Sequence, residues 1–337
     1  MKVFEWTNPA SLNEAVQMLG VTGASGDIDE APRPIAGGQD LLTTMKDYTT
    51  RPSRVVNLKS IRGMDRITGD ARKGLTIGAL VTLNQLEEHP VVRASFPGLA
   101  EAAHSVATPQ IRNLGTVGGN LCQRPRCWYF RLEEAVCLKK GGSECYAAAG
   151  ENKYHAIIAG GPSFIVHPSD LAPMLVALGA RVSVTGSEGK RVIALEKFFT
   201  LPSEGSIRRE NVLKNDEIIT EIQVPPSPLA AHSTYLKFKE RESLDFAIAS
   251  VAAAVELQAN KTVKDVRIVL GGVAPIPWRV PAAEKSVIGK SLSPDVLAEA
   301  GRLALAEARP LEKNAYKVPL TQTLVRRALA KAAGIQA

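Results

Sequence analysis

All four cysteines of the chain lie between residues 122 and 145, separated by four, nine and seven residues. Thiolates bind iron–sulfur clusters and zinc, and pairs of thiols form disulfides. Disulfides are typical of small exported domains, and zinc sites usually contain closely paired cysteines, a spacing that only the first gap fits. An iron–sulfur cluster takes four thiolates at irregular spacing. The pattern therefore favours an iron–sulfur cluster, with zinc, disulfides and free thiols as alternatives. The candidate ligands are Cys122, Cys127, Cys137 and Cys145.

Basic and aromatic residues are interspersed among these cysteines. Positive charges would stabilise the reduced, more negative form of a cluster, and aromatic rings would shield it from water. The same residues equally suit a solvated loop and ordinary core packing. They are Arg124, Arg126, Arg131, Lys139, Lys140 and the aromatic run Trp128–Phe130.

Two paired-glycine motifs provide a second kind of chemistry. Gly37-Gly38 lies between a short apolar run and a helical pattern, and Gly118-Gly119 is a turn signal directly before the cysteines. Paired glycines let backbone N–H groups approach an anion closely. One such motif is weak evidence, but two beside polar side chains could hold the two ends of one pyrophosphate. Neither matches the GxGxxG fingerprint of a Rossmann unit.

The composition is that of a globular protein. A chain of 337 residues with 45% hydrophobic and 22% charged residues is expected to form about two or three domains. No apolar run approaches the ~20 residues that span a bilayer, so we expect no membrane insertion. The net charge of +7 is scattered, which disfavours nucleic-acid binding. The N-terminus lacks an export signal pattern, so we expect a cytoplasmic protein, or a periplasmic one if a signal-bearing partner carries it.

The elements that must position these motifs follow from caps and periodicity. Ser11 with Glu14 and Thr82 with Gln85 form capping boxes, and Ser169 is a candidate N-cap. A linker at Pro225–Pro228 marks a domain boundary. Strands are predicted at 54–58, 75–80, 164–167, 181–185 and 217–224 and, beyond the linker, three antiparallel ones at 235–241, 247–257 and 266–273, with helices at 293–307 and 318–333.

Four motifs together resemble a known family. The chain contains PIAGGQDLLTTMK, TPQIRNLGTVGGN, HPSDLAPMLVALGA and YLKFKERESLDFAIASVAAAV, in that order. They are similar to the FAD subunit of the xanthine dehydrogenase, carbon monoxide dehydrogenase and aldehyde oxidoreductase family. The resemblance implies an α+β chain with an FAD-binding fold of the vanillyl-alcohol-oxidase (PCMH) type, made of two subdomains, over residues 1–225. A C-terminal domain of a three-stranded antiparallel sheet and helices would follow over 229–337.

The resemblance also implies which residues bind FAD. Both glycine loops would wrap the pyrophosphate, with Ile35 and Leu114 as wall residues. Asp170 would contact the ribityl or adenosine side. Lys237 would lie near the flavin ring, or else be an ordinary strand lysine. The loop residues are Ala36, Gly37, Gly38, Gln39, Asp40, Leu41 and Leu42 in the first loop and Thr116, Gly118, Gly119 and Asn120 in the second.

The cysteine segment resembles an insertion found in part of this family. It is similar to the FAD subunits of periplasmic-type aldehyde oxidoreductases and of 4-hydroxybenzoyl-CoA reductases, which hold an additional [4Fe–4S] cluster, and QRPRCWYFR favours the first group. This implies a [4Fe–4S] insertion at about residues 121–160 with all four cysteines as ligands. Some relatives place a cluster cysteine near the position of His155, so His155 could replace Cys122 or Cys127, or be a polar loop residue.

The function implied is that of an electron-transfer subunit of a heterotrimeric molybdenum-dependent aldehyde oxidoreductase. Its partners would be a molybdopterin-binding large subunit, which oxidises the substrate, a small [2Fe–2S] subunit and an external electron acceptor. The first alternative is the corresponding subunit of a 4-hydroxybenzoyl-CoA reductase, with electrons flowing inward. The second is a nucleotide-binding module stabilised by zinc or disulfides.

Overall fold

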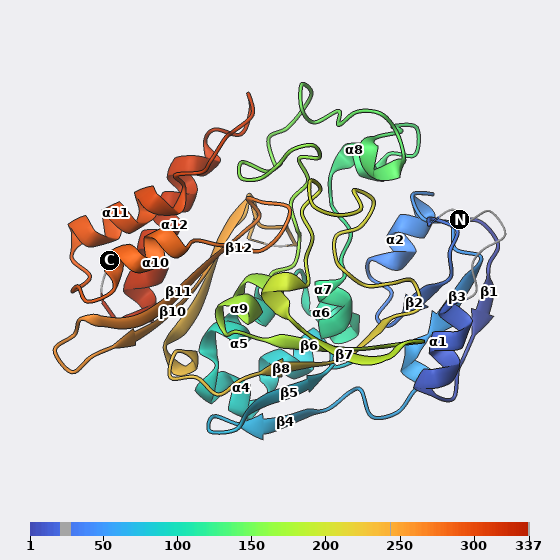
Figure 1. Cartoon of the computed structure of the whole chain (residues 1–337), viewed down its shortest axis with the longest axis horizontal. Helices are drawn as coiled ribbons and strands as arrows, with labels where there is room; N and C mark the ends of the chain where they lie inside the picture. Colours follow the sequence, from blue (N-terminus) through green and yellow to red (C-terminus); the bar gives the residue numbers. More distant parts are fainter. Residues whose placement is uncertain (21–27, 243, 336–337) are drawn as a thin grey trace.

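The described residues form three β-sheets flanked by helices (Figure 1). The structure is a computed structural model that describes residues 1–20, 28–242 and 244–335. Two of the sheets are built mainly from the N-terminal two thirds of the chain, and the third follows the proline-rich linker. The predicted α+β fold, with two subdomains and a C-terminal antiparallel sheet with helices, is therefore confirmed. No helix in the described ranges is both long and apolar enough to cross a membrane.

The first sheet is three-stranded and parallel, with the order β1-β3-β2. Helix α1 (Leu12–Gly20) contributes a buried apolar face to the small core that it shares with β3. It begins where predicted, because the Ser11 hydroxyl accepts a hydrogen bond from the Glu14 backbone N–H at 3.2 Å. Helix α2 (Leu41–Lys46) follows the first glycine loop. The strands are β1 (Glu5–Thr7), β2 (Arg33–Ile35) and β3 (Arg54–Asn57).

The second sheet is five-stranded and antiparallel, with the order β4-β5-β8-β6-β7. The predicted capping box at Thr82 is present: its hydroxyl accepts from the Gln85 N–H at 3.1 Å, and the Gln85 side chain accepts from the Thr82 N–H at 2.8 Å. The strands are β4 (Ile67–Asp70), β5 (Gly74–Gly78), β6 (Arg181–Gly186), β7 (Gly189–Ala194) and β8 (Ile218–Val224). The helices of this part are α3 (Leu83–Glu88), α4 (Pro90–Ser95), α5 (Pro97–His104), α6 (Pro109–Leu114), α7 (Val117–Leu121) and α9 (Leu171–Ala177).

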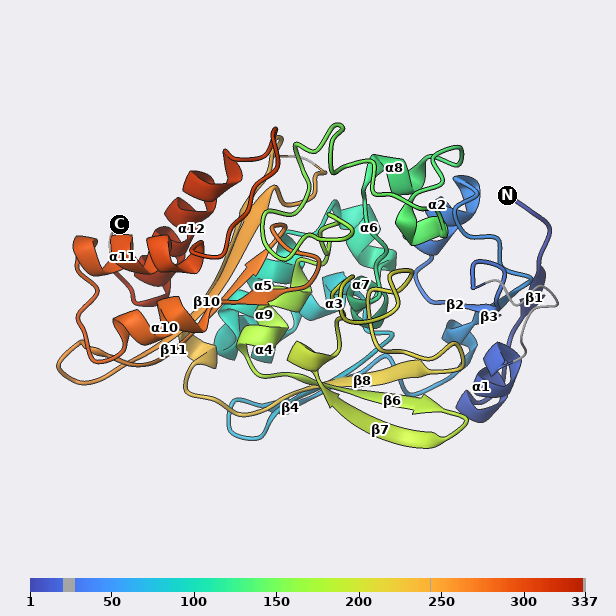
Figure 2. The ribbon, with the colours of Figure 1, turned by 45° about the horizontal axis from the view of Figure 1, so that its top comes forward.

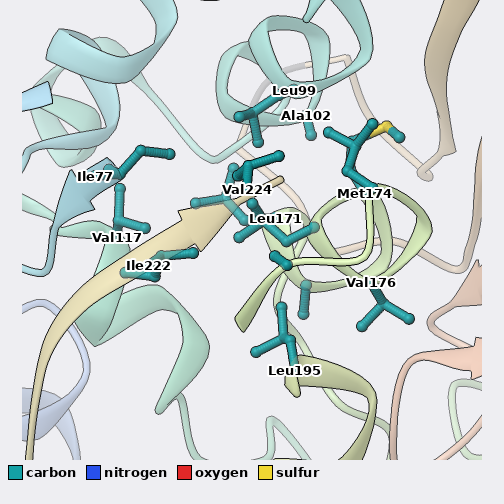
Figure 3. Close-up of a cluster of buried hydrophobic side chains, with 14 of the residues drawn as sticks. Ile77, Leu99, Ala102, Val117, Leu171, Met174, Val176, Leu195, Ile222 and Val224 are labelled. Carbon is teal, nitrogen blue, oxygen red and sulfur yellow. The ribbon is translucent and has the colours of Figure 1, made fainter. Parts of the chain in front are cut away.

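The largest apolar core lies between this sheet and the helices that cover it. Figure 3 shows Ile77 and Ile222 of the sheet facing Leu99 of α5 and Leu171 of α9, and all four are fully buried. Burying an aliphatic side chain of this size contributes about 1.5–3 kcal/mol. Val117, also fully buried in this core, directly precedes Gly118. The second glycine loop is thus anchored by the core of the second subdomain.

The C-terminal sheet is antiparallel, with the order β12-β11-β10-β9. Its two faces join different cores, as the alternation of strand side chains requires: Ala252 and Ala254 of β10 belong to the core with α5 and α9, whereas Val251 and Val255 pack against the C-terminal helices. The strands are β9 (Ser233–Phe238), β10 (Ala249–Leu257), β11 (Val263–Gly271) and β12 (Trp278–Arg279). The helices are α10 (Pro281–Val287), α11 (Pro294–Ala304) and α12 (Lys317–Ala332).

Two predicted elements are wrong. Residues 164–167 form no strand, because their backbone groups pair with single loop residues: the His167 N–H donates to the Ala274 carbonyl, and the Phe164 carbonyl accepts from the Ala156 N–H. Gly118-Gly119 is not a turn but lies inside helix α7. The short elements β4, β7, β12 and α10 were not predicted; β7, for example, lies at a sheet edge and is mostly exposed, so it carries no apolar pattern.

Residues 122–165 form a largely irregular segment, called the cysteine segment below. Its α-helical part is α8 (Trp128–Arg131). In Figures 1 and 2 it lies on the same side of the molecule as α2 and extends toward the chain that leads into α12. Hydrogen bonds reach it from both directions, from Asp40 at the start of α2 and from Asn314 before α12.

Candidate functional site

A cavity of about 670 Å³, called the large cavity below, is lined by residues from all three parts of the fold. Its size lies within the range of about 300–1,000 Å³ that is usual for sites of small ligands and cofactors. It is bounded by the first glycine loop and α2, by residues 106–124, and by the loop at 208–217. The predicted cofactor residues that line it are Ile35, Ala36, Gly37, Gly38, Gln39, Asp40, Leu41, Thr116, Gly119, Asn120 and Asp170.

The two glycine loops touch at one wall of this cavity. A Cβ atom on Gly37 would lie 2.1 Å from the carbonyl oxygen of Leu114, so this approach requires glycine. Gly38 has a φ of +73°, in the left-handed region that glycine adopts readily. Two motifs that are far apart in the sequence therefore form one continuous surface.

The second loop is held by side-chain hydrogen bonds. The Thr116 hydroxyl accepts from the Gly119 N–H at 3.2 Å and caps α7. The buried Asn120 side chain accepts from the Ser169 hydroxyl at 2.5 Å, and the same hydroxyl accepts from the Ala172 N–H. Ser169 thus acts as the predicted cap of α9 and also ties the second loop to the helix start that carries Asp170.

Four residues of the predicted set lie outside the cavity lining. Gly118 packs against Ala79. A Cβ atom added to Gly118 would lie only 3.0 Å from the Ala79 Cβ, so the small size of glycine allows this packing. Leu42 and Leu114 are 39% and 48% exposed, and Leu114 contributes its carbonyl to the contact with Gly37. Lys237 is buried behind the wall rather than in it.

Lys237 forms a buried ion pair with a residue of the wall. Its ammonium lies 2.8 Å from the Asp170 carboxylate, and the two side chains are only 4% and 6% exposed. Lys237 also donates to the Ser105 carbonyl, and the Tyr235 hydroxyl donates to the other Asp170 oxygen at 2.7 Å. Burial raises the pKa of Tyr235 well above its ordinary value, so the phenol remains a donor. These contacts fix the direction of the Asp170 carboxylate.

Replacing Lys237 with methionine is expected to destabilise the fold by about 2–3 kcal/mol, because Asp170 would keep only the hydrogen bond from Tyr235. The measurement is urea unfolding followed by circular dichroism. Lys264→Met is the matched control, since Lys264 forms an exposed, solvent-screened pair with Glu256 whose loss should leave the stability almost unchanged. Equal effects of the two substitutions would contradict this role of the buried pair.

Three of the arginines that line the large cavity each carry a guanidinium nitrogen without a hydrogen-bond partner in the described part of the chain. Arg33 Nε, Arg126 Nε and Arg131 Nη1 are buried and have no hydrogen-bond partner among the described residues, and all three residues line the cavity. Buried donors normally have partners, and guanidinium groups are well matched to phosphate oxygens. Burial lowers the pKa of Arg33 to about 10, and the nearby Arg124 adds to this. The donor set therefore fits a ligand that carries phosphate groups.

Asp40 connects the first glycine loop to the cysteine segment. Its carboxylate accepts from the Arg124 backbone N–H at 2.7 Å and from the Arg131 guanidinium at 2.8 Å, and it pairs with Arg126. Burial alone would raise the pKa of Asp40, but the two arginines outweigh it and keep the pKa below its usual value. These basic residues, predicted either to stabilise a cluster or to lie in a solvated loop, in fact hold the two motifs together.

The loop at residues 208–217 forms a wall that the sequence analysis missed. Glu210 is buried there and pairs with Arg124 at 2.7 Å and with Lys139 at 2.8 Å. Lys139 is itself only 2% exposed and also donates to the carbonyl of Ile207. The consecutive charges Arg208, Arg209 and Glu210 were the available signal, but a charged loop normally indicates solvent exposure.

The structure divides the four cysteines between two cavities. Cys122 follows α7 and lines the large cavity. Cys127, Cys137 and Cys145 line a second cavity of about 10 Å³ together with His155, called the cysteine cavity below. All four cysteines are free. Within the described residues, no group of three or more His, Cys, Asp or Glu side chains is placed to hold a metal ion.

His155 is buried in this cavity, with 3% of its surface exposed. Its Nε2 lies 3.1 Å from the Cys127 sulfur, and its Nδ1 is buried without a hydrogen-bond partner in the described part of the chain. Burial lowers the pKa of His155 to about 4, helped by the charge of Lys317, so the imidazole is neutral near pH 7. A neutral imidazole and three thiols are all potential metal ligands.

Two consecutive parts of the chain match models of known protein families. Residues 2–227 match the FAD binding domain in molybdopterin dehydrogenase. Residues 233–332 match the CO dehydrogenase flavoprotein C-terminal domain. The first match alone covers more than half of the chain, and it includes both glycine loops and the cysteine segment.

Known proteins and structures agree with these matches over nearly the full length. The chain is 36% identical over 302 residues to the aldehyde oxidoreductase FAD-binding subunit PaoB of Escherichia coli, covering 88% of this chain and 90% of that protein. It is 29% identical to the carbon monoxide dehydrogenase medium chain of Hydrogenophaga pseudoflava, covering 97% and 96%. A solved carbon monoxide dehydrogenase of that organism, lacking the Mo-pyranopterin moiety of its cofactor, has a TM-score of 0.76 at 28% identity, covering 100% and 99%. The chain therefore belongs to the molybdenum hydroxylase family, as one of its FAD-binding oxidoreductase subunits.

Proposed function

We propose that this chain is the electron-transfer subunit of a molybdenum-dependent aldehyde oxidoreductase and carries FAD and a [4Fe–4S] cluster. The observation that carries the proposal is the contact between the two sites: Asp40 of the first glycine loop accepts hydrogen bonds from Arg124 and Arg131 of the cysteine segment. The similarity to the FAD-binding subunit of an aldehyde oxidoreductase supports the aldehyde as substrate class. In this proposal a partner subunit oxidises the aldehyde.

FAD would occupy the large cavity and supply one- and two-electron chemistry when bound. The residues that line the cavity from both glycine loops would surround the pyrophosphate, and Arg33, Arg126 and Arg131 would donate to its oxygens. The Asp170 carboxylate, held in position by Lys237 and Tyr235, would accept hydrogen bonds from hydroxyl groups of the cofactor. The predicted role of Lys237 beside the flavin ring becomes an indirect one, through Asp170.

The residue types that line the cysteine cavity, though not their present positions, suit a cluster. Cys127, Cys137 and Cys145 are free thiols that line one cavity, and thiolates are the usual ligands of [4Fe–4S] centres. The cavity has room for about one water molecule, so a cluster would require its walls to move apart. Much of these walls is irregular loop rather than helix or strand.

The proposed partners are a molybdopterin-binding large subunit and a small [2Fe–2S] subunit, with an external acceptor for the electrons. The names of the relatives as FAD-binding subunit and medium chain support assembly with other chains. The proposed division of the chain into domains at 1–225 and 229–337 is supported by family matches that end at residue 227 and begin again at 233. The proposed insertion at about 121–160 lies inside the first match.

Purified protein is expected to contain about four iron atoms and one FAD per chain, as a [4Fe–4S] flavoprotein must. Its visible spectrum should combine flavin bands with a broad iron–sulfur absorption that bleaches on addition of dithionite. Metal analysis together with acid-released flavin measures both. A yellow protein that contains zinc or no metal would contradict the cluster and leave the flavin site standing.

The direction of electron flow separates this proposal from a 4-hydroxybenzoyl-CoA reductase type of enzyme. The assembled complex should reduce a dye when given an aldehyde. Reduction of an aromatic CoA thioester by reduced ferredoxin, without aldehyde-dependent dye reduction, would instead support inward flow. A colourless protein without flavin would support a plain nucleotide-binding module.

A further inference from the structure

We infer that Asp40 is a positioning residue of the flavin site: it orients Arg126 and Arg131 of the cysteine segment toward the phosphates and does not itself bind FAD. This inference rests on the proposed function, because it assumes that FAD occupies the large cavity. It differs from the prediction that Asp40 wraps the pyrophosphate with the rest of the first glycine loop. It also implies that flavin affinity and the order of the cysteine segment depend on each other.

The first argument is the chemistry of the Asp40 carboxyl group. Burial would raise its pKa, but Arg126 and Arg131 outweigh burial and hold the pKa below its usual value, so the group is ionised near neutral pH. An ionised carboxylate can only accept hydrogen bonds. The oxygens of a pyrophosphate are also negatively charged acceptors, so the two groups would repel each other. A carboxylate on the wall of a phosphate site therefore needs neighbouring cations, and Asp40 is paired with two.

The second argument is how the nitrogens of the two guanidinium groups are used. Arg126 pairs with Asp40 through Nη1 and donates from Nη2 to the Gln123 side chain at 3.2 Å. Arg131 donates from Nη2 to Asp40 and from Nε to the Pro125 carbonyl, both at 2.8 Å. The remaining nitrogen of each group, Arg126 Nε and Arg131 Nη1, is buried without a partner among the described residues. A guanidinium held in this way offers one donor and loses little side-chain freedom when a ligand binds.

The third argument is the attachment of the cysteine segment at this end of the molecule. Residues 123–127 belong to no helix or strand. The Arg124 backbone N–H donates to Asp40 at 2.7 Å, and the Arg124 carbonyl accepts from the Arg131 guanidinium at 3.2 Å. The same carboxylate thus holds both the backbone of the segment and its two arginines. A ligand that fixes these arginines favours the ordered segment, and by linkage an ordered segment favours the ligand.

Asp40→Asn tests this role because two explanations predict opposite signs. Removal of a negative charge from the cavity wall would, by Coulomb attraction alone, tighten the binding of an anionic ligand. As a positioning residue, Asp40 instead makes charge-assisted hydrogen bonds that the amide cannot replace, so we expect the Kd for FAD to rise about tenfold. Asp47→Asn is the matched control. Asp47 lines the same cavity but forms no ion pair with Arg126 or Arg131 among the described residues, so its loss should leave FAD binding unchanged or slightly tighter.

The measurement is titration of the flavin-free, full-length chain with FAD, together with hydrogen exchange of residues 123–131. In wild type, FAD should slow exchange of the Arg124 amide, and in Asp40→Asn this protection should be lost. Arg126→Met should also weaken FAD binding about tenfold, because a phosphate donor is lost. Addition of Asp40→Asn to the double variant Arg126→Met, Arg131→Met should weaken binding no further, since Asp40 then has no arginine of this pair to position.

An added loss of affinity in that triple variant would mean that Asp40 contacts FAD directly and would overturn the inference. FAD affinity in Asp40→Asn equal to or above that of wild type would also overturn it. If Asp40→Asn does not fold, Arg126→Met decides, and unchanged affinity there is the contrary result. A wild-type chain that binds no FAD would instead refute the proposed flavin site itself.

Discussion

Gly37→Ala should abolish stable flavin binding. The new Cβ would meet the Leu114 carbonyl oxygen at 2.1 Å, far inside van der Waals contact, so the two glycine loops would have to separate. Because both loops line the same cavity, their separation would remove part of the site that we propose for the FAD pyrophosphate. We expect at least a tenfold weaker affinity for FAD, which corresponds to about 1.4 kcal/mol, and purified protein with little bound flavin.

The measurement is the ratio of flavin absorbance to protein absorbance in the purified protein, followed by titration of the apoprotein with FAD. Gly205→Ala is the matched control, because an added Cβ there meets only ordinary contacts, the nearest being the Thr200 Cβ at 3.5 Å. The control should bind FAD as wild type does. Full flavin occupancy in Gly37→Ala would show that the contact between the two loops does not shape the site.

Glu210→Ala should be the most destabilising single change in the loop at 208–217. It would leave Lys139 and Arg124, which are 2% and 17% exposed, without their carboxylate partner. Removing one partner of a buried ion pair typically costs about 3–5 kcal/mol. The loss would be seen as a lower free energy of unfolding in urea and as release of the cysteine segment, detected by faster labelling of its thiols.

Two comparisons test whether the loss of the buried ion pairs of Glu210 causes this destabilisation. Glu299→Ala removes an exposed, solvent-screened pair with Arg302 and should leave the free energy of unfolding almost unchanged. Burial would raise the pKa of Glu210, but Arg124 and Lys139 outweigh it and hold the pKa below its ordinary value of 4.5. The stability from this carboxylate is therefore present above pH 4.5 and is lost as the pH falls through the lowered pKa. The difference in the free energy of unfolding between wild type and Glu210→Ala should be constant from pH 7 to 4.5 and should become smaller below pH 4.5.

Local sequence patterns predicted the parts of the fold that local physics determines. Capping residues such as Ser11 and Thr82 start helices where their hydroxyls accept backbone N–H groups. Gly37, Gly38 and Gly119 of the two loops line one cavity, and the close approach of the Leu114 carbonyl demands glycine at Gly37. Residues 164–167 have the apolar composition of a strand but no neighbouring strand to pair with, and composition does not reveal the partner.

The missed parts of the site depend on contacts between distant segments. Nothing near Glu210 indicates that its partners are Arg124 and Lys139, some seventy to eighty-five residues earlier in the chain. The spacing of the cysteines likewise did not show that Cys122 ends a helix at the large cavity while His155 lies with the later cysteines. Side-chain type indicated the chemistry, and only tertiary structure assigned each group to a cavity.

The anchoring of the cysteine segment by Asn314 and Lys317 determines which parts of this protein unfold together. The segment precedes the proline-rich linker in the sequence, yet the carbonyls of Asn152 and His155 are bonded to side chains that follow it. Elements that share buried hydrogen bonds open together. Hydrogen exchange in the backbone around His155 should therefore follow the stability of the C-terminal helices, and the cooperative folding unit does not coincide with the domain that a cut at the linker would release.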